Sequence, residues 1–352
     1  MYLRANNKMN VYLERLNCFE KEKKYEYQCI SLFSGGGGLD LGAHFAGFKS
    51  LLVSDLVPAY TQTIKANLPH VQVYNDDAMD LTPEIIRNLA KVNGDIDLLI
   101  AGPPCQAFSI IGKRQSLHDP RGMLTVKYFE LVAGLKPKVF VFENVPGLMT
   151  LNKGKDFEQL LEFVQKLTGY KIYKTKLNAA DFGIPQIRER VFVVGFRTDI
   201  DADGFSFPTR PTGALADSLP EKVPSKYALE NVDGLPNQQI RVHTEAVKKR
   251  FAAVPQGGRD KGSYSDKLNP ELPSGTVLIG SSGGGARPHI HPYEPRALTV
   301  REMARLQSFP DWYVFMGTRT EQYRQVGNAV PPLLAYELLS SIKHVLEAQD
   351  VS

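Results

Sequence analysis

A lone cysteine follows two prolines at the end of an apolar run. Residues 98–101 are Leu-Leu-Ile-Ala, and residues 102–106 are Gly-Pro-Pro-Cys-Gln. A short apolar run that stops at Gly and Pro is typical of a buried strand ending in a rigid turn. Because the prolines restrict the backbone, Cys105 would be held in place, as a nucleophile must be to meet one substrate atom. A free cysteine can equally be a buried packing residue, and this motif alone leaves both interpretations open.

Charged residues at two other strand ends could assist such a nucleophile. Glu143 follows the apolar run 139–142, and the carboxyl ends of parallel strands meet in the crevice where open sheets bind ligands. A buried Glu with a raised pKa can act there as a general acid. Arg188 and Arg190 precede the run 191–195, and in an extended chain their side chains point the same way. Two guanidiniums suit a planar carbonyl or a phosphate, and their positive charge favours a thiolate nearby. Taken alone, each motif has a simpler interpretation: an exposed glutamate in the first case and a pair of surface arginines in the second.

A glycine-rich turn after the first apolar run indicates a nucleoside site. Glycines between a strand and a helix let the backbone approach a ligand closely, and they stand here at Gly35, Gly36, Gly37 and Gly38. Their spacing does not fit the G-x-G-x-x-G pattern of dinucleotide folds. Asp55 follows the second run, where a carboxylate can bind ribose hydroxyls. S-adenosylmethionine fits this half-site as well as NAD does, and a tight turn beside a surface aspartate is the structural alternative.

These residues stand at the ends of segments that alternate between strand and helix patterns from about residue 29 to 198. The expected strands are 29–33, 50–54, 97–101, 139–142 and 191–195, and the expected helices are 59–67, 83–91, 123–135 and 157–167. This alternation predicts an α/β fold with an open, mostly parallel sheet and helices on both faces. Residues 199–295 are rich in Pro, Gly, Ser and Asn, which predicts a separate loop-rich module, and helical patterns return at 300–306 and 332–347.

Composition excludes several classes of protein. The chain has 352 residues, of which 43% are hydrophobic and 23% charged, as in a soluble globular protein. No run approaches the roughly 18 apolar residues of a membrane span, and the polar residues 1–28 contain no apolar secretion signal. Three cysteines without a C-x-x-C pair argue against a disulfide framework and a zinc site and favour a reducing cytoplasm. The net charge of +4 is only mildly basic, so nucleic-acid binding must be argued from local patches.

Six sequence blocks in one order together resemble the bacterial DNA (cytosine-5)-methyltransferases, the modification enzymes of restriction–modification systems. The blocks are FSGGGGL at 33–39, GPPCQAFS at 102–109, ENV at 143–145, QIRER at 186–190, RALTVREMARLQSFP at 296–310 and QVGNAVPP at 325–332. The resemblance covers 29–198 and about 290–340 and implies a Rossmann-like, S-adenosylmethionine-dependent methyltransferase fold. It implies an N-terminal extension of unknown role at 1–28, a catalytic and cofactor-binding domain at 29–198, a smaller target-recognition domain at 199–295, and a segment at 296–352 that returns to complete the catalytic domain.

The resemblance implies a role for each candidate catalytic residue. In the family, the cysteine at the position of Cys105 adds to C6 of cytosine, a covalent route that splits one hard step into two. The glutamate at the position of Glu143 hydrogen-bonds or protonates N3, Arg190 would hold the carbonyl O2, and Arg188 would support the site or a phosphate. C5 then takes the methyl group, and loss of the C5 proton and of the thiol restores the ring. The base must be flipped out of the duplex, and the loop expected to close over it and contact DNA carries Gln106, Ser109, Lys113 and Arg114.

The resemblance also implies S-adenosylmethionine as the cofactor, with no metal. Phe33 is expected beside the adenine or the sulfonium, and glycines 35–38 beside the methionine part. Asp55 would take the ribose hydroxyls, Asp77 the adenine amine, and Asn328 would close the site from the C-terminal helix. The other residues expected at this site are Leu39, Leu56, Ala78 and Pro104. The family often has Glu and an aromatic residue where this chain has Asp55 and Leu56, so the ribose and adenine contacts depart from the family pattern here.

The loop-rich module is the expected reader of double-stranded DNA. Residues 241–261 hold six Lys and Arg against Glu245 and Asp260, a surplus of six minus two, or +4, equal to that of the whole chain. A local basic patch suits contact with the DNA backbone, although the run 248–250 could also be a solvated helix face. The DNA contacts expected in the module are Arg241, Lys248, Lys249, Arg250 and Arg259.

The sequence therefore predicts methylation of C5 of a flipped-out cytosine in a specific duplex sequence. The enzyme is expected to act as a monomer in the bacterial cytoplasm and to protect host DNA from a separate restriction endonuclease. The alternatives are the same chemistry on tRNA, a non-catalytic DNA-binding protein on this scaffold, and a nicotinamide oxidoreductase. The separate module at 199–295 favours DNA over tRNA as the substrate. Catalysis is favoured over a non-catalytic role because the chain retains the set Cys105, Glu143, Arg190 and Asn328. The spacing of the glycines disfavours NAD as the cofactor.

Overall fold

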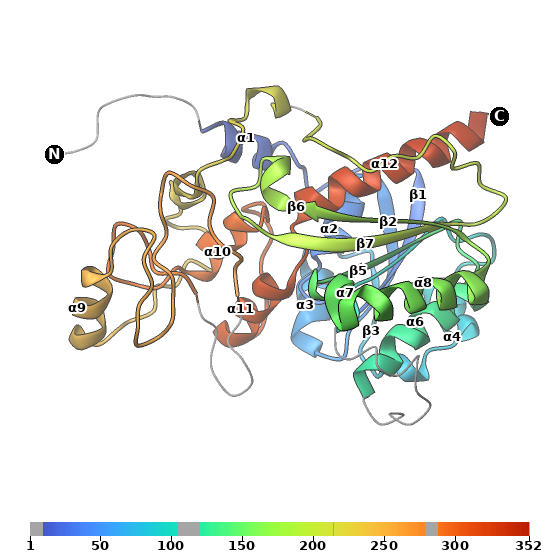
Figure 1. Cartoon of the computed structure of the whole chain (residues 1–352), viewed down its shortest axis with the longest axis horizontal. Helices are drawn as coiled ribbons and strands as arrows, with labels where there is room; N and C mark the ends of the chain where they lie inside the picture. The colour runs from blue at the N-terminus through green and yellow to red at the C-terminus, as the bar shows by residue number, and fades with distance from the viewer. Residues whose placement is uncertain (1–9, 105–119, 214, 279–287, 352) are drawn as a thin grey trace.

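A seven-stranded sheet forms the centre of the molecule (Figure 1). The computed structural model describes residues 10–104, 120–213, 215–278 and 288–351. The sheet has the strand order β3-β2-β1-β4-β5-β7-β6. Its strands are β1 Tyr27–Leu32, β2 Phe48–Ser54, β3 Gln72–Tyr74, β4 Leu98–Ala101, β5 Val139–Asn144, β6 Lys171–Asn178 and β7 Glu189–Phe196. The first five strands pair in parallel, and β7 runs antiparallel to both β5 and β6, which confirms the mostly parallel sheet.

Helices cover both faces of the sheet, and alternate residues of each strand face the two cores. Leu98 and Ile100 of β4 belong to one fully buried cluster, with α2 Gly38–Phe45 and α12 Pro332–Val351. Leu99 and Ala101 belong to the other, as expected where successive side chains of a strand point to opposite faces. The helices over this second face are α4 Pro83–Ala90, α6 Pro120–Leu135 and α8 Lys155–Thr168.

The strand order fixes where a ligand site can form. The chain winds outward from β1 through β2 to β3 and then returns to place β4 on the other side of β1. The carboxyl ends of β1 and β4 therefore flank the point where the winding direction reverses, which is where open α/β sheets leave a crevice. The residues that follow these two strands are Phe33 and Gly102, the starts of the glycine turn and of the Gly-Pro-Pro-Cys motif.

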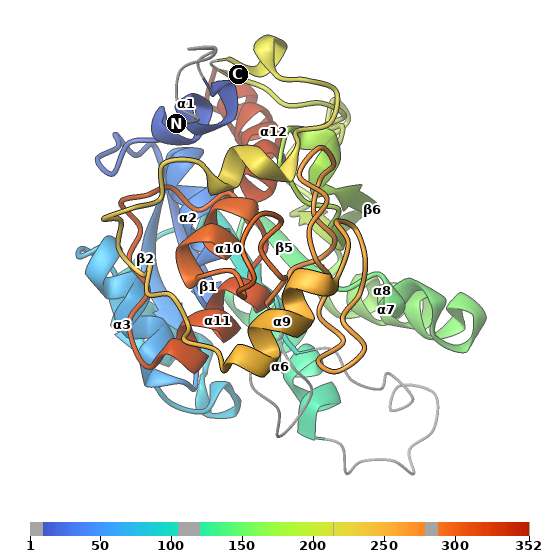
Figure 2. The ribbon, with the colours of Figure 1, turned by 90° about the vertical axis from the view of Figure 1, so that its left-hand side faces the viewer.

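A second, loop-rich lobe lies beside the sheet and contains few regular elements. In the described part of residues 199–295, the helical elements are α9 Glu245–Ala253 and the short 3₁₀ turns η4 Ala216–Ser218 and η5 Ser225–Leu229. Figure 2 looks onto this lobe, with α9 and α10 in front of the sheet. The remaining helices are α1 Val11–Asn17, α3 Pro58–Asn67, α7 Gly147–Thr150, α10 Val300–Leu306 and α11 Arg319–Asn328, and the remaining 3₁₀ turns are η1 Ala78–Asp80, η2 Leu151–Gly154 and η3 Ala179–Phe182.

The residues before β1 form part of the core. Asn10 caps α1, because its side chain accepts a hydrogen bond from Leu13 N. Tyr12 and Leu16 are fully buried in the cluster that contains α2 and α12. Arg15 is buried as well, and its Nη2 lies 2.7 Å from Oε1 of Glu337 on α12. Residues 10–18 therefore help to fix α12 to the rest of the molecule.

Arg15→Met is expected to lower the free energy of unfolding by about 3 to 5 kcal/mol, because Glu337 would keep a buried charge without its ion-pair partner. Thr212 still donates to both oxygens of Glu337, which limits the loss to the lower part of this range. Chemical denaturation measures the change. The control is Lys222→Met, which removes a pair with Asp181 whose side chains are 45% and 50% exposed and which should cost less than about 1 kcal/mol. Equal losses in the two variants would contradict a structural role for the buried pair.

Candidate active site

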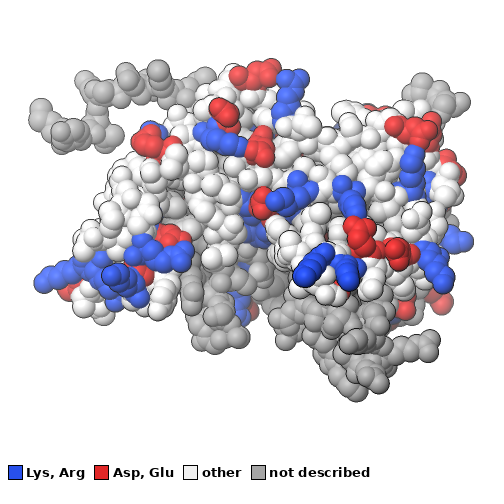
Figure 3. All heavy atoms as spheres, in the orientation of Figure 1, with Lys and Arg blue, Asp and Glu red and all other residues white. Residues whose placement is uncertain are grey.

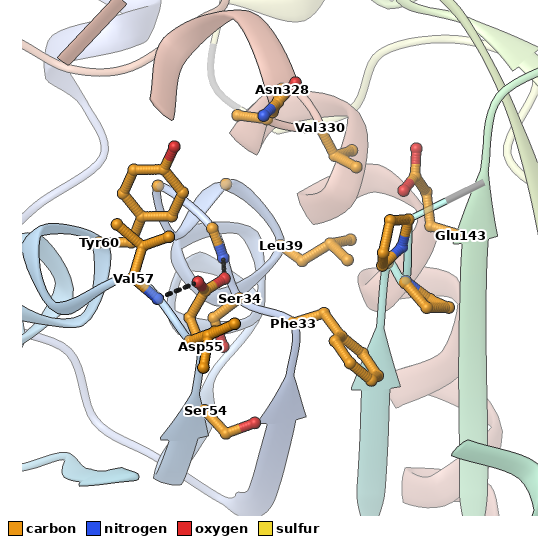
Figure 4. Close-up of a pocket in the computed structure, with 18 of the residues that line it drawn as sticks. Phe33, Ser34, Leu39, Ser54, Asp55, Val57, Tyr60, Glu143, Asn328 and Val330 are labelled. Atoms are coloured by element: carbon orange, nitrogen blue, oxygen red, sulfur yellow. Dashed lines mark hydrogen bonds between the residues drawn. The ribbon is translucent and has the colours of Figure 1, made fainter. Parts of the chain in front are cut away.

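A cavity of about 640 Å³ opens at the carboxyl ends of β1, β2, β4 and β5. Its walls include Phe33 after β1, Asp55 after β2, Pro104 after β4 and Glu143 in β5. Figure 4 shows Asp55, Val57 and Tyr60 on one side of the cavity and Glu143 on the other, with Phe33 and Leu39 between them. The cavity thus occupies the crevice that the strand order predicts.

The glycine turn lies tightly packed against the C-terminal segment. A Cβ atom on Gly36 would lie 2.8 Å from Cβ of Gln325, and one on Gly38 would lie 2.1 Å from the carbonyl oxygen of Val330. At Gly37, where φ is +78°, a Cβ atom would lie 2.4 Å from the hydroxyl of Tyr313. Among the four glycines of the turn, Gly35 alone has no atom of the described residues within 4 Å of its Cβ position. The turn therefore needs glycine mainly for its packing, and it is open to a ligand at Gly35.

Asp55 is held by the backbone of this turn and of its own strand end. Its two carboxylate oxygens accept hydrogen bonds from Gly35 N and Val57 N, each at 2.9 Å (Figure 4). Burial raises the pKa of Asp55, and the two backbone hydrogen bonds oppose this shift. Each oxygen accepts one bond from the protein and retains lone pairs for another donor, such as a hydroxyl group.

Phe33 has an unusual backbone conformation at the cavity wall. Its φ is +55°, in the left-handed region that bulky residues rarely adopt. Figure 4 shows the Phe33 ring at the cavity, near the end of β1. Residues held in such conformations tend to gather at ligand sites, because the surrounding structure must maintain them.

The other expected cofactor residues lie at the cavity with one exception. Leu39, Leu56, Asp77, Ala78, Pro104 and Asn328 all line it, whereas Gly37 does not. Asp77 also caps η1, because its Oδ1 accepts a hydrogen bond from Met79 N at 2.9 Å. Asn328 lines the cavity from the end of α11, so the expectation that it belongs to the last helix is wrong; that helix, α12, begins at Pro332.

Glu143 and Arg190 form an ion pair at the opposite side of the cavity. Oε1 of Glu143 lies 2.8 Å from Nε of Arg190, and both side chains are about 10% exposed. A Cβ atom on Gly102 would lie 2.8 Å from Oε2 of Glu143, so the carboxylate lies directly over the start of the Gly-Pro-Pro-Cys motif. Asn144 strengthens this junction, because its Nδ2 donates to Pro103 O at 3.2 Å. The geometry brings together the two charged residues that sequence analysis assigned to the ring atoms.

Burial raises the pKa of the Glu143 carboxyl, although the charges of Arg190 and Arg188 oppose this shift. The carboxyl therefore keeps its proton to a higher pH than an ordinary glutamic acid. An acid with a raised pKa is better suited to donate a hydrogen bond or a proton to a ring nitrogen. The paired guanidinium of Arg190 offers further N–H donors, which suit a carbonyl oxygen.

Of the two roles expected of Arg188, support of the site or contact with a phosphate, the structure fits only the first. Its side chain is 1% exposed and does not line the cavity, so a contact with a DNA phosphate does not fit. Its guanidinium instead donates to Val277 O at 3.2 Å and to Gly327 O at 2.7 Å. Arg188 therefore acts as a positioning residue that ties β7 to the second lobe and to the end of α11.

Gln186 and Gln307 make a similar connection that sequence analysis did not assign. Nε2 of Gln186 donates to Oε1 of Gln307 at 2.8 Å, and its Oε1 accepts from Val277 N at 2.9 Å. Gln307 in turn donates to Val326 O at 2.6 Å. No local pattern reveals this network, because its members come from segments far apart in the chain.

Other cavity residues also went unassigned. They come from the strand ends, from α3 and α6, and from the segments that follow β3 and α11. They are Ser34, Ser54, Val57, Tyr60, Asp76, Gly102, Pro103, Leu124, Asn144, Val145, Ala329 and Val330. Most of these residues are adjacent in sequence to one of the motifs, and that is the only sequence signal for them. Tyr60 and Leu124 are not adjacent to a motif, so the sequence gives no signal for these two.

Part of the expected DNA-binding set lies on and around α9. Lysine and arginine side chains gather over this helix, with acidic side chains among them (Figure 3). Three of the expected cations are paired within the protein: Lys248 with Glu245, Arg250 with Asp260 and Arg259 with Asp266. Arg241 and Lys249 are exposed and have no ion-pair partner among the described residues. Residues 248–250 lie on α9, so the alternative interpretation of a solvated helix face fits the structure. The count of Lys and Arg alone overstated the positive charge that is not paired within the protein.

Five expected site residues lie outside the described residues. They are Cys105, Gln106, Ser109, Lys113 and Arg114. Within the described ranges, no helix is long and apolar enough to cross a membrane. Nor does this part of the chain hold a group of three or more His, Cys, Asp or Glu side chains able to bind a metal ion.

Comparison with known proteins yields consistent matches. Residues 27–344 match the family described as C-5 cytosine-specific DNA methylase. The chain is 37% identical to the type II methyltransferase M1.HphI of Haemophilus parahaemolyticus, over 91% of this chain and 88% of that protein. It is 38% identical to the type II methyltransferase M.NgoFVII of Neisseria gonorrhoeae, over 89% of this chain and 85% of that protein. A solved structure of a putative DNA modification methyltransferase encoded within an Escherichia coli prophage is similar with a TM-score of 0.74 and 29% identity, over 92% of this chain and all of that one.

Proposed function

The chain belongs to the C-5 cytosine-specific DNA methylases, and from this premise we propose that it methylates C5 of a flipped-out cytosine through a covalent bond between Cys105 and C6. It acts as a monomer on a specific duplex sequence in the bacterial cytoplasm and protects host DNA from a separate restriction endonuclease. One observation carries the proposal: the Glu143–Arg190 pair and the Asp55–glycine turn share one cavity, and Pro104 on its wall immediately precedes Cys105.

The cavity fits S-adenosylmethionine. Its volume of about 640 Å³ is in the range of small-molecule sites. The open position at Gly35 leaves room beside the turn, and Asp55 keeps acceptor capacity for ribose hydroxyls. Apolar walls from Phe33, Leu39 and Val57 suit the adenosyl and methionine carbons. When bound, S-adenosylmethionine supplies an electrophilic methyl group.

The protein's residues make cytosine reactive toward that methyl group. The thiolate of Cys105 adds to C6, and the electron pair of the ring moves toward C5 and N3. Glu143 donates a hydrogen bond or a proton at N3, while Arg190 donates to O2, so charge that builds up in the ring is neutralised where it forms. The contact between Oε1 of Glu143 and Nε of Arg190 orients both side chains toward one edge of the base, and Glu143 donates there in its protonated form. After methyl transfer, loss of the C5 proton and expulsion of the thiolate restore the aromatic ring.

Flipping is required because neither face of C5 and C6 is accessible in a stacked duplex. The second lobe supports duplex DNA as the substrate, because it holds exposed basic residues beside the cavity-bearing lobe. Incubation with labelled S-adenosylmethionine and mixed-sequence duplex DNA tests the proposal, followed by bisulfite sequencing to find the methylated site. Methylation of tRNA instead of DNA would show that the substrate proposed here is wrong. Absence of labelled methyl groups on cytosine C5 would refute the proposed C5 methylation.

Lys249→Gln is expected to weaken duplex binding and to reduce the slope of log Kd against log salt concentration by about 0.9, the value for one phosphate contact. The side chain is exposed on α9 and has no ion-pair partner among the described residues. Arg259→Gln is the matched control, because its guanidinium already pairs with both oxygens of Asp266 at 2.6 and 2.9 Å. Binding to fluorescent duplex DNA at several salt concentrations measures both. Equal slope changes in the two variants would contradict this division of free and paired cations.

A further inference from the structure

Tyr60 is a cavity residue for which the family resemblance gives no role. It lies in the first turn of α3, directly after the strand end that carries Asp55. Its side chain lines the cavity and is half-buried. Its hydroxyl has no hydrogen-bond partner among the described residues, so a donor points into a ligand site without a protein acceptor. Polar groups in such positions commonly fix the orientation of a ligand.

The backbone of Tyr60 is held rigidly. Tyr60 N donates to Val57 O at 3.0 Å, next to the Val57 N–H that binds Asp55. One turn further along α3, Thr63 accepts a hydrogen bond from Met316 N at 2.8 Å. A Cβ atom on Gly317 would lie 2.8 Å from Cβ of Ala59, so the segment before α11 packs directly on the start of α3. The start of α3, from which the Tyr60 side chain extends, is therefore held in place by contacts within the protein.

The hydroxyl of Tyr60 faces the end of α11. In Figure 4, it points away from Asp55 and toward the side of the cavity on which Asn328 lies. Arg324 stands four residues before Asn328 on α11, so the two share one helix face. The charge of Arg324 acts on the Tyr60 hydroxyl, and the nearby acids are Asp55 and Glu321. Glu321 is already engaged with Thr318 in the capping box of α11, and Asp55 with two backbone N–H groups.

This corner suits a carboxylate more than it suits adenine. It offers the phenol O–H of Tyr60, the amide of Asn328 and the positive charge of Arg324. Burial and the charge of Asp55 raise the pKa of Tyr60, which keeps its hydroxyl protonated as a donor. Asp77 and Ala78, by contrast, line the cavity from the segment that follows the edge strand β3. If Asp55 holds the ribose, the adenine extends toward β3 and the amino-acid tail extends along the glycine turn toward α11.

We propose that the Tyr60 hydroxyl binds the α-carboxylate of S-adenosylmethionine, with Arg324 supplying positive charge beside it. Tyr60 is then a specificity-determining residue that distinguishes the complete cofactor from nucleosides that lack the amino-acid tail. The inference rests on the proposed use of S-adenosylmethionine at this cavity.

Calorimetric titration of the full chain tests this assignment with two ligands, S-adenosylmethionine and 5′-methylthioadenosine, which lacks the carboxylate. Tyr60→Phe retains the ring and removes the donor, so it should raise the Kd of S-adenosylmethionine about tenfold, the effect of one hydrogen bond to a charged group. The Kd of 5′-methylthioadenosine should not change. Arg324 is exposed on the surface of α11. Arg324→Gln should weaken the binding of S-adenosylmethionine but not that of 5′-methylthioadenosine, and the effect should decrease as the salt concentration rises.

Tyr227→Phe is the matched control, because this partly buried tyrosine in η5 also has a hydroxyl without a hydrogen-bond partner among the described residues. It should leave both titrations unchanged. An unchanged Kd of S-adenosylmethionine in Tyr60→Phe overturns the inference, and equal weakening of both ligands assigns Tyr60 to the adenosyl part instead, which overturns it as well. Failure of the unaltered protein to bind S-adenosylmethionine is a different result, since it overturns the proposed function itself.

Discussion

Cys105→Ala is expected to lower the rate of methyl transfer to DNA by at least about 10⁴-fold, the order of loss when an enzyme's nucleophile is removed. Without the thiolate, C6 receives no electron pair and C5 stays a poor nucleophile toward a methyl sulfonium. The remaining groups, Glu143 and Arg190, can stabilise charge in the ring only if addition at C6 creates it. Single-turnover transfer of labelled methyl groups to duplex DNA measures the loss.

Cys18→Ala is the matched control, because this cysteine is exposed and free. It should retain full activity. A second measurement uses duplex DNA that contains 5-fluorocytosine: fluorine cannot leave as the proton does, so the Cys105–C6 bond persists and a complex survives denaturation. The unaltered protein and Cys18→Ala should form this complex with S-adenosylmethionine, whereas Cys105→Ala should not. Full activity in Cys105→Ala would refute covalent catalysis at this residue.

The strand ends that carry the site could be predicted because their signals are local. Apolar runs followed by Gly, Pro or an acid predicted β1, β2, β4 and β5, and parallel pairing brings their carboxyl ends into one crevice. The edge strands β3 and β6 were not predicted. β3 has only three residues, and β6 reads Lys-Ile-Tyr-Lys-Thr-Lys-Leu-Asn with mostly exposed or half-buried side chains. Edge strands often carry lysines that prevent pairing with other chains, which weakens their apolar pattern.

The different partners of Arg188 and Arg190 could not be predicted from the residue pattern, because both follow the same extended pattern; the separate roles expected of them came from the family resemblance. Both guanidiniums act electrostatically on Glu143, as the shared direction of their side chains suggests. Arg190 meets the carboxylate, whereas Arg188 finds the carbonyl oxygens of Val277 and Gly327. These partners lie 89 and 139 residues further along the chain, and no local rule specifies contacts of that separation.

The N-terminal segment illustrates the same limit. Its polar composition gave no reason to expect a buried helix, and the partner of Arg15 lies 322 residues away. The role proposed for Tyr60 could not be predicted for the same reason. It depends on the position of α11 next to α3, which the packing of Gly317 on Ala59 determines. Sequence patterns and the family resemblance therefore predicted many of the residues that line the cavity, while the residues that hold and orient them emerged only from tertiary contacts.

Glu143→Gln is expected to lower the rate constant of methyl transfer by about 10² to 10³-fold, in the range for loss of a general acid or of one charge-stabilising donor. The amide oxygen can still accept from Arg190 Nε, so the variant should keep the local geometry and the affinity for S-adenosylmethionine. What it loses is the ability to transfer a proton to N3. Glu189→Gln is the control on the neighbouring strand β7, because that carboxylate pairs with Lys176 and is 41% exposed; it should leave the rate unchanged.

The pH profile separates proton donation by Glu143 from a merely structural role. Burial raises the pKa of this carboxyl, so the protonated, donating form is present below the raised pKa and is lost as pH rises through it. Formation of the Cys105 thiolate has the opposite dependence, since it increases with pH. The single-turnover rate of the unaltered protein should therefore fall on the alkaline side, and Glu143→Gln should lose this alkaline limb while keeping the rise with thiolate formation. An alkaline limb that persists in Glu143→Gln would assign the titrating group elsewhere, because glutamine has no proton to lose in this range.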